Sequence, residues 1–303
     1  MRFLASYVLT GRVQAIGAVS ALLGLSLVLP PVGLLSSAAV ALVTLRLGGA
    51  EGATVIGISA LLSALLGGFF VGSPASFASY GAVLWVPAWI VAYVLRERVD
   101  LALALEAGVV VAAAGVVGVY VFTDTPSDLW RGSLELMLRP LLDNPPPGFS
   151  VEQLRERLDW LAGYMTGVVA AGSLLGVTAS LFLARWWQAQ LFNPGGFGQE
   201  YLALRGHSPL ALGTIALLVA ALAAQGLAAE VAGNLLAVAL GFYVVAGVAV
   251  LHSLCAGLAA KRFLLVVLYG ALLVVPHVLA PVALAGLADV WLDLRRWGRS
   301  AGA

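Results

Sequence analysis

The charged side chains of this chain are confined to the edges of long apolar runs. They make up only 10% of its 303 residues. Arg12 precedes one run, Arg46 follows the next, and Lys261-Arg262 separate two later runs. A charged side chain at the centre of a bilayer costs about 2.5–3.5 kcal/mol or more, so this placement indicates a chain that crosses a membrane repeatedly. The sequence therefore predicts an all-α fold, a polytopic helical transmembrane bundle.

The composition agrees with a membrane protein and excludes several other classes. Hydrophobic residues account for 61% of the chain, against about half in soluble domains. A net charge of +1 argues against a nucleic-acid partner. The lone cysteine, Cys255, lies in an apolar run, so we expect neither a disulfide framework nor a cysteine-based metal site. The N-terminal apolar run lacks a convincing Ala-x-Ala site, and we interpret it as a retained first span.

Nine apolar runs are candidate spans, because a helix needs about 20 residues to cross the hydrocarbon and fewer when its ends snorkel. They are Val13–Leu29, Val32–Leu45, Ala53–Phe70, Tyr80–Leu95, Leu101–Val121, Trp160–Ala184, Leu210–Leu227, Val231–Leu251 and Phe263–Val278. We expect a single integral membrane domain over residues 1–303, with about eight to nine spans. The short runs beside Pro30-Pro31 and Pro276-His277 are interpreted as hairpins with proline at the turn. Re-entrant segments at a binding site are the alternative.

The lysines and arginines orient the chain, because cytoplasmic loops are enriched in them. A cytoplasmic N-terminus places the following residues inside: Arg2, Arg12, Arg46, Arg96, Arg98, Arg185, Arg205, Lys261 and Arg262. We also expect Arg295, Arg296 and Arg299 inside, which requires an even number of crossings. Either the run from Pro281 to Trp291 completes a short hairpin, or one of the short runs fails to cross.

Residues 123–159 are expected outside the membrane, as an amphipathic helix followed by a connector. Leu134 and Leu138 follow a helical spacing, and the ring of Trp130 suits the headgroup level. The helix is therefore expected to lie in the membrane interface and to stop at Arg139-Pro140.

A second helix is predicted beyond the rigid connector at 144–148. Ser150 followed by Gln153 matches a capping box. We expect the helix that starts there to run unbroken into the span at Trp160–Ala184.

Small residues recur every four positions along that span. They are Gly172, Gly176, Ser180 and Ala184. Such a stripe lets helix backbones approach closely in lipid, so we expect it to pack against another helix.

Five polar residues within or beside the apolar runs are candidate binding residues, because an ionisable group in a membrane is a functional hypothesis by default. They are Glu106, Glu230, Asn234, His252 and Asp289. Glu106 could instead snorkel, and Glu230 with Asn234 could either cap a helix or line an outward-facing pocket. His252 is better explained as a packing histidine. No pair has the spacing of metal ligands, so neither a metal nor a cofactor is expected.

No catalytic motif is recognisable. A Ser-His-Asp arrangement cannot be dismissed by counting residues, but no nucleophile-elbow pattern supports one. We therefore do not expect the protein to be an enzyme.

Residues 185–209 are predicted to form a cytoplasmic loop rich in tryptophan and glycine. Its candidate partner contacts are Arg185, Trp186, Trp187, Asn193, Gly195, Gly196 and Phe197. The loop is not a phosphate-binding loop, since no Gly-Lys-Ser/Thr follows and no strand precedes it. A structural loop with its tryptophans at the membrane interface is the alternative to a contact site for a cytoplasmic partner.

These same residues carry a family resemblance. Residues 183–188 (LARWWQ), 193–197 (NPGGF) and 286–296 (GLADVWLDLRR) resemble the YybS-like family of predicted bacterial inner-membrane proteins, over essentially the whole chain. The resemblance implies a multi-pass protein of the bacterial inner membrane. The six N-terminal spans are also distantly similar to the substrate-binding membrane subunits of energy-coupling-factor transporters, with residues 48–53 (GGAEGA) resembling a turn of that group.

We therefore expect a small-molecule binding or transport subunit, and a non-catalytic membrane scaffold or assembly factor is the alternative. The expected partners are the lipid bilayer, a small-molecule ligand and a membrane or cytoplasmic protein. Transport predicts a polar cavity between spans that contains Glu106 or Asn234, whereas a solid apolar bundle would contradict it.

Overall fold

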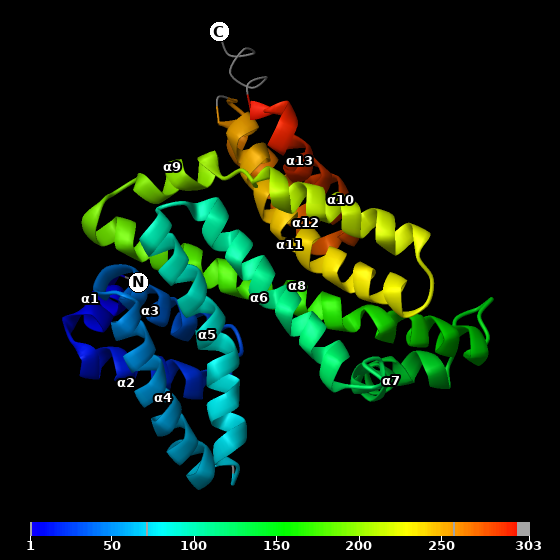
Figure 1. Cartoon of the computed structure of the whole chain (residues 1–303), viewed down its shortest axis with the longest axis horizontal. Coiled ribbons are helices and arrows are strands. Elements are labelled where there is room, and N and C mark those ends of the chain that lie inside the picture. Colours follow the sequence, from blue (N-terminus) through cyan, green and yellow to red (C-terminus); the bar gives the residue numbers. More distant parts are fainter. Residues whose placement is uncertain (1, 71, 257, 296–303) are drawn as a thin grey trace.

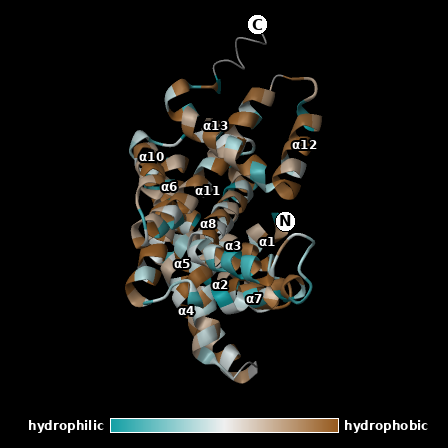
Figure 2. Ribbon diagram, turned by 90° about the vertical axis from the view of Figure 1, so that its right-hand side faces the viewer, coloured by the Kyte–Doolittle hydropathy of each residue, from teal (hydrophilic) through white to brown (hydrophobic). Residues whose placement is uncertain are grey.

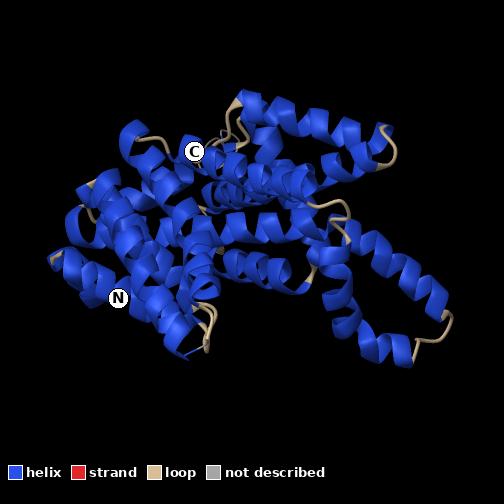
Figure 3. Ribbon diagram, turned by 60° about the horizontal axis from the view of Figure 1, so that its bottom comes forward, coloured by secondary structure: helices blue, strands red, loops and turns tan. Residues whose placement is uncertain are grey.

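The computed structural model describes residues 2–70, 72–256 and 258–295, and these form helices without any strand (Figures 1 and 3). The helices are α1 (Arg2–Thr10), α2 (Arg12–Ser26), α3 (Val32–Leu47), α4 (Gly49–Phe70), α5 (Pro74–Arg98), α6 (Leu101–Phe122), α7 (Asp128–Asp143), α8 (Val151–Phe192), α9 (Gly196–Ala203), α10 (Ser208–Ala223), α11 (Leu227–Cys255), α12 (Lys261–Val274), a 3-10 turn η1 (Pro276–Val278) and α13 (Leu279–Leu292). The expected all-α fold is thus confirmed for the described residues. Arg296 and Arg299 lie outside them.

Five helices of the described chain are long and apolar enough to cross a membrane: α4, α5, α6, α8 and α11. Two bent pairs raise the number to seven if each pair is one span: α9 with α10, bent by 47°, and α12 with Pro276–Leu292, bent by 116°. The ribbons of helices such as α10 and α12 are coloured mostly as hydrophobic (Figure 2). The expected count of eight to nine is not confirmed. Two of the expected spans, α2 and α3, have only 15 and 16 residues, or about 23 Å of helix against a hydrocarbon core of about 30 Å.

Several of the arginines that were expected on one side of the membrane lie near the C-terminal end of α8 and the segment that follows it. Arg2 donates to the Gln190 carbonyl at 3.0 Å, and the Arg46 guanidinium lies 3.8 Å from the centroid of the Phe192 ring. Arg295 donates to the Leu204 carbonyl. Residues 2 and 295 thus both contact the region formed by the last turn of α8 and the segment that joins it to α10, so both lie at the same end of the bundle, which we call the arginine-rich end.

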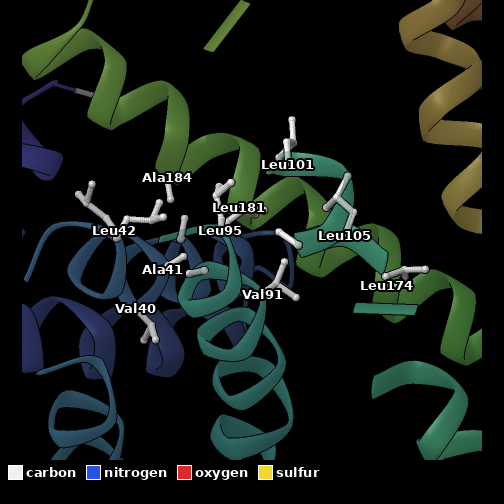
Figure 4. Packing of buried hydrophobic residues seen from close by; sticks show 14 of the residues in the cluster. Val40, Ala41, Leu42, Val91, Leu95, Leu101, Leu105, Leu174, Leu181 and Ala184 are labelled. Carbon is white, nitrogen blue, oxygen red and sulfur yellow. The ribbon is translucent and has the colours of Figure 1, made fainter. Parts of the chain in front are cut away.

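The core centres on α3, whose residues 38–43 are all buried. Alanine at three of these six positions lets α2, α4, α5 and α8 pack around it. Trp85 of α5 is fully buried and donates from Nε1 to Ser36 Oγ at 2.9 Å. Toward the arginine-rich end, Leu95, Leu105 and Leu181 close the space between α5, α6 and α8 with an apolar layer (Figure 4).

The segment 123–159 differs in part from expectation. The capping box is present: Gln153 N donates to Ser150 Oγ at 3.2 Å, and Ser150 N donates to Gln153 Oε1 at 2.9 Å. The expected stop at Arg139-Pro140 is wrong, because α7 continues to Asp143. Pro140 withdraws only one backbone donor, and Asn144 N still donates to the Pro140 carbonyl at 3.2 Å to close the last turn.

Helix α7 packs on the first turns of α8. Leu134, Leu158 and Ala162 form a small buried cluster, and Trp130 donates from Nε1 to Thr166 Oγ1 at 2.9 Å. The ring expected at the headgroup level therefore contacts α8. With 42 residues, α8 is about 63 Å long and runs across the whole molecule (Figure 1), more than twice the thickness of the hydrocarbon. Its N-terminal part and α7 must therefore project beyond the bilayer unless α8 is strongly tilted.

The crossing of α11 and α13 depends on glycine. A Cβ at Gly286 would clash with the Tyr243 carbonyl and the backbone of Gly247, and a Cβ at Gly247 would clash with the Val282 carbonyl. The obstructing atoms are backbone, so the two helices can approach this closely only because neither residue has a side chain.

We expect Gly286→Ala to destabilise the protein by about 1–3 kcal/mol, because the added methyl group forces α13 away from α11. Thermal unfolding in nanodiscs measures the loss as a lower midpoint. Gly270→Ala on α12 is the matched control, since nothing lies within 4 Å of a Cβ there. Equal midpoints for the two variants would contradict the backbone contact.

Candidate functional site

A polar cleft of about 950 Å³ lies at the arginine-rich end, between the α5–α6 turn and the α8–α10 segment. Its charged and polar lining residues are Arg96, Glu97, Arg98, Asp100, Arg185, Gln188, Glu200, Arg205 and His207. Two of the arginines are neutralised by carboxylates: Arg185 pairs with Glu200, and Arg205 pairs with Asp293 and Asp289. The remaining two have no carboxylate partner within the described part of the chain.

Glu106 does not snorkel freely but ties α6 to the start of α10. One carboxylate oxygen accepts from the backbone N–H of His207 at 2.7 Å, and the other lies 3.1 Å from His207 Nδ1. His207 precedes α10, and its imidazole Nε2 lies 3.5 Å from a carboxylate oxygen of Asp100. Asp100 also accepts from Leu103 N at 2.9 Å and thereby caps α6. The imidazole thus bridges two carboxylates at the rim of the polar cleft.

Asp289 is the centre of a buried ion cluster. Its Oδ2 accepts from Arg205 Nε at 3.2 Å and from Arg295 Nε at 3.1 Å. Arg295 also donates to the carbonyls of Leu202 and Leu204. The Asp289 side chain is only 1% exposed, and its Oδ1 has no hydrogen-bond partner among the described residues. The cluster therefore holds the end of α13 against the segment that leads into α10.

The pKa values of the two arginines shift in opposite directions. Burial lowers the pKa of Arg295, although the charge of Asp289 opposes the shift. Burial also acts to lower the pKa of Arg205, but hydrogen bonds and charges from Asp293 and Asp289 outweigh it, and the net shift is upward. Arg295 is thus held in a site that disfavours its charge, so this cluster depends on Asp289.

Asn234 is fully buried in a hydrogen-bond network and lines neither the polar cleft nor the two further cavities described below. Its Oδ1 accepts from Gly167 N, and its Nδ2 donates to the Gly163 carbonyl at 2.8 Å. These two backbone groups lie one turn apart in α8, so the amide bridges them. Tyr120 donates to Glu230 Oε1 at 2.6 Å and accepts from Asn234 Nδ2 at 2.9 Å. Glu230 and Asn234 therefore join α6, α8 and α11.

His252 takes part in an aromatic cluster. Its Nε2 lies 3.3 Å from the Tyr269 hydroxyl, its Nδ1 lies 3.0 Å from the Val248 carbonyl, and its ring packs edge-on against Tyr201. These contacts agree with a packing role, which was the preferred interpretation.

The expected loop at 185–209 is mostly helical, because α8 continues to Phe192 and α9 starts at Gly196. Trp187 is 1% exposed, so its expected position at a membrane interface is wrong, whereas Trp186 is 39% exposed. Both residues occupy the last turns of α8 and face different directions. Asn193 and Gly195 form the short turn between the two helices.

Phe197 packs inward on Phe182, with ring centroids 5.3 Å apart. Arg185 is engaged by Glu200, and a Cβ at Gly196 would clash with the side-chain amide of Asn193. The expected contact residues therefore mainly hold α9 in place.

A site that the sequence did not reveal is an apolar cleft of about 510 Å³ among α3, α5, α6 and α8. Its lining residues are Leu34, Ser37, Val83, Leu84, Pro87, Gly108, Val111, Ala112, Gly115, Val169, Ala170, Gly172, Ser173, Leu174, Gly176, Val177 and Ser180. Of the stripe that we expected to pack against another helix, Ala184 is buried in the core, and Gly172, Gly176 and Ser180 provide part of this wall. Small residues in the middle of a span were the available signal, but they indicate helix contact and a cleft equally well.

Polar groups of the apolar cleft are mostly engaged. Ser37 donates to the Leu84 carbonyl at 3.2 Å, Ser173 to the Val169 carbonyl at 2.9 Å, and Ser180 to the Gly176 carbonyl at 3.0 Å. Pro87 has no N–H, so the carbonyl of Val83, one turn earlier, lacks its helical donor. The cleft thus offers an apolar surface with few acceptors.

A third depression, the α5/α6 groove, has about 890 Å³. It is lined by Ile90, Tyr93, Val94, Glu97, Arg98, Leu103, Glu106, Ala107, Val110 and Val111. Glu106 lines this groove, but most of the other lining residues are apolar and its carboxylate is already bonded to His207, so the groove is not the polar cavity that transport predicts.

Within the described residues, no group of three His, Cys, Asp or Glu side chains is arranged to hold a metal ion. The clefts therefore offer charge, shape and apolar surface as their means of recognition. Comparison of the chain with protein-family models, curated proteins and solved structures yields no match.

Proposed function

We propose that this protein is a non-catalytic membrane subunit that binds a small apolar or amphiphilic molecule taken from the bilayer, and that the apolar cleft is its binding site. The observation that carries the proposal is the cleft itself, which four helices form in the middle of the bundle. A ligand pocket is typically concave, mostly apolar and several hundred Å³ in volume, and the apolar cleft has these properties.

Glycine leaves room along two walls of the cleft. A Cβ at Gly115 of α6 or at Gly172 of α8 would have no atom within 4 Å. Both residues are exposed, so the cleft opens sideways toward the space that lipid would occupy. An apolar molecule could therefore enter from the bilayer without passing through water. Because each buried methylene contributes about 0.8 kcal/mol, several of them would suffice for a measurable preference.

Filling the cleft tests the proposal. We expect Gly115→Phe and Gly172→Phe to reduce photolabelling of α6 and α8 by a diazirine-bearing long-chain alcohol in nanodiscs by about tenfold, equivalent to about 1.4 kcal/mol. The new ring would occupy the space of the ligand without displacing the backbone. Mass spectrometry of labelled peptides provides the measurement.

Gly118→Phe is the matched control, because Gly118 lies on the same helix, also has open space and does not line the cleft. It should leave the labelling unchanged. Equal labelling of the cleft helices and of the exposed helices α10 and α12 would show that the alcohol only samples the protein surface and would refute the proposal.

A membrane scaffold is the second candidate, and the projecting α7 favours it. Leu136 and Met137 are 72% and 77% exposed on the face of α7 that points away from α8. The Trp/Gly segment supports a scaffold less, since Trp187 is buried. We also propose that the chain belongs to the YybS-like family and is distantly similar to energy-coupling-factor subunits. We propose further that it lies in a bacterial inner membrane with its N-terminus in the cytoplasm. The arginine-rich end supports this orientation.

A further inference from the structure

The three cavities of the α5–α6 hairpin share lining residues. Glu97 and Arg98 line both the polar cleft and the α5/α6 groove, and Val111 lines both the groove and the apolar cleft. The three cavities therefore adjoin one another from the arginine-rich end along α5 and α6 to the apolar cleft, and together they are called the track.

The track is polar at one end and apolar along the rest of its length. Beyond Glu97, Arg98 and Glu106, the groove is lined by Tyr93 and aliphatic side chains. This polarity matches an amphiphile that lies along the helices with its headgroup at the arginine-rich end.

The available charges at that end favour an anion. Arg98 is exposed and pairs with no group in the described chain, and Arg96 donates only to the Leu45 carbonyl, at 2.6 Å. Arg46 nearby contacts the Phe192 ring and no carboxylate. Glu97 is the one carboxylate of the polar cleft and groove without a partner among the described residues. The two available guanidinium groups of the polar cleft, Arg96 and Arg98, thus outnumber its one available carboxylate, Glu97.

The length of the track fits one leaflet. From Leu103 to Gly115, α6 rises about 18 Å, and half of the hydrocarbon core measures about 15 Å. A lipid chain that starts beside Arg98 would therefore reach the apolar cleft near the middle of the bilayer.

From these observations we propose that the ligand is an anionic phospholipid of the leaflet at the arginine-rich end, with its phosphate at Arg98 and Arg96 and one acyl chain in the α5/α6 groove and the apolar cleft. This inference rests on the proposed function, because it specifies the molecule that the apolar cleft receives. A basic side chain near a membrane surface attracts an anionic lipid by about fivefold in affinity.

The test compares two diazirine lipids that carry the same labelled chain, a phosphatidylglycerol and a phosphatidylcholine, in nanodiscs of the full chain. We expect the anionic probe to label α5, α6 and α8 peptides at least about fivefold more strongly. Arg98→Gln should remove most of this preference and leave labelling by the zwitterionic probe unchanged. Arg98 holds no other residue in place, so the variant should fold.

Two further variants sharpen the result. Glu97→Gln removes the opposing carboxylate and should increase labelling by the anionic probe. Arg155→Gln is the matched control, because Arg155 is exposed at the far end of α8 and should have no effect.

The outcomes separate this inference from the proposed function. If both probes label the cleft equally, remain sensitive to Gly115→Phe and do not respond to Arg98→Gln, the anionic headgroup is refuted and the apolar site stands. If neither probe labels the track above the level of α10, both proposals fail.

Discussion

Replacing Asp289 with alanine is expected to destabilise the protein by about 3–5 kcal/mol, the typical cost of removing one partner of a buried ion pair. The carboxylate is 1% exposed and accepts from both Arg205 and Arg295. Without it, Arg295 would remain 5% exposed beside another cation. We expect the unfolding midpoint in nanodiscs to fall sharply and the end of α13 to become accessible to protease.

Three comparisons separate the charge from other effects. Asp289→Asn keeps the side-chain volume but removes the charge. We therefore expect it to destabilise the protein nearly as much as Asp289→Ala. Asp143→Ala breaks an exposed pair with Arg139, 3.8 Å apart, and should change stability by less than about 1 kcal/mol. The double variant Asp289→Leu/Arg295→Met should recover part of the loss, since an apolar pair needs no counter-charge. An unchanged midpoint for Asp289→Ala would show that the cluster does not hold α13.

The sequence predicted the helices and the end of the bundle at which several of the arginines lie, because charge and helix length follow from local composition. It also predicted the capping box at Ser150, which needs only residues three positions apart. The number of crossings was less accessible. Whether the 15 and 16 residues of α2 and α3 cross depends on tilt and neighbours, and hydropathy does not determine these.

The candidate sites were harder to predict, because their partners lie far away in the sequence. Glu106 meets His207, and Asp289 meets Arg205, across about 100 and 84 positions. In helices that are apolar on every side, periodicity also does not reveal which face meets protein and which meets lipid. The stripe in α8 illustrates the difficulty, since Ala184 is fully buried while Gly172 faces the open cleft.

The second large loss of stability is expected on replacing Asn234, whose side-chain amide bonds to two backbone groups of α8. We expect Asn234→Leu to cost roughly 3 kcal/mol or more, because the buried amide that bonds Gly167, Gly163 and Tyr120 is lost and its polar partners lose these bonds. The loss is hard to relieve. The backbone of Asn234 lies close to the position that a Cβ at Gly167 would occupy, so α8 and α11 are in backbone contact, and leucine has no space there.

Asn234→Asp distinguishes hydrogen bonding from packing, because aspartate has nearly the same shape. It can still accept from Gly167 N, but its second oxygen cannot donate to the carbonyls of Gly163 and Glu230. If the donor function matters, Asp should destabilise about as much as Leu, and hydrogen exchange at residues 163–167 should rise in both.

Asn144→Asp in the exposed connector is the control and should leave both readouts unchanged. Thr166 holds Trp130 within this same turn of α8, so loosening the turn should also increase exchange in α7. A stable Asn234→Asp variant with unchanged exchange would mean that shape alone joins α8 to α11.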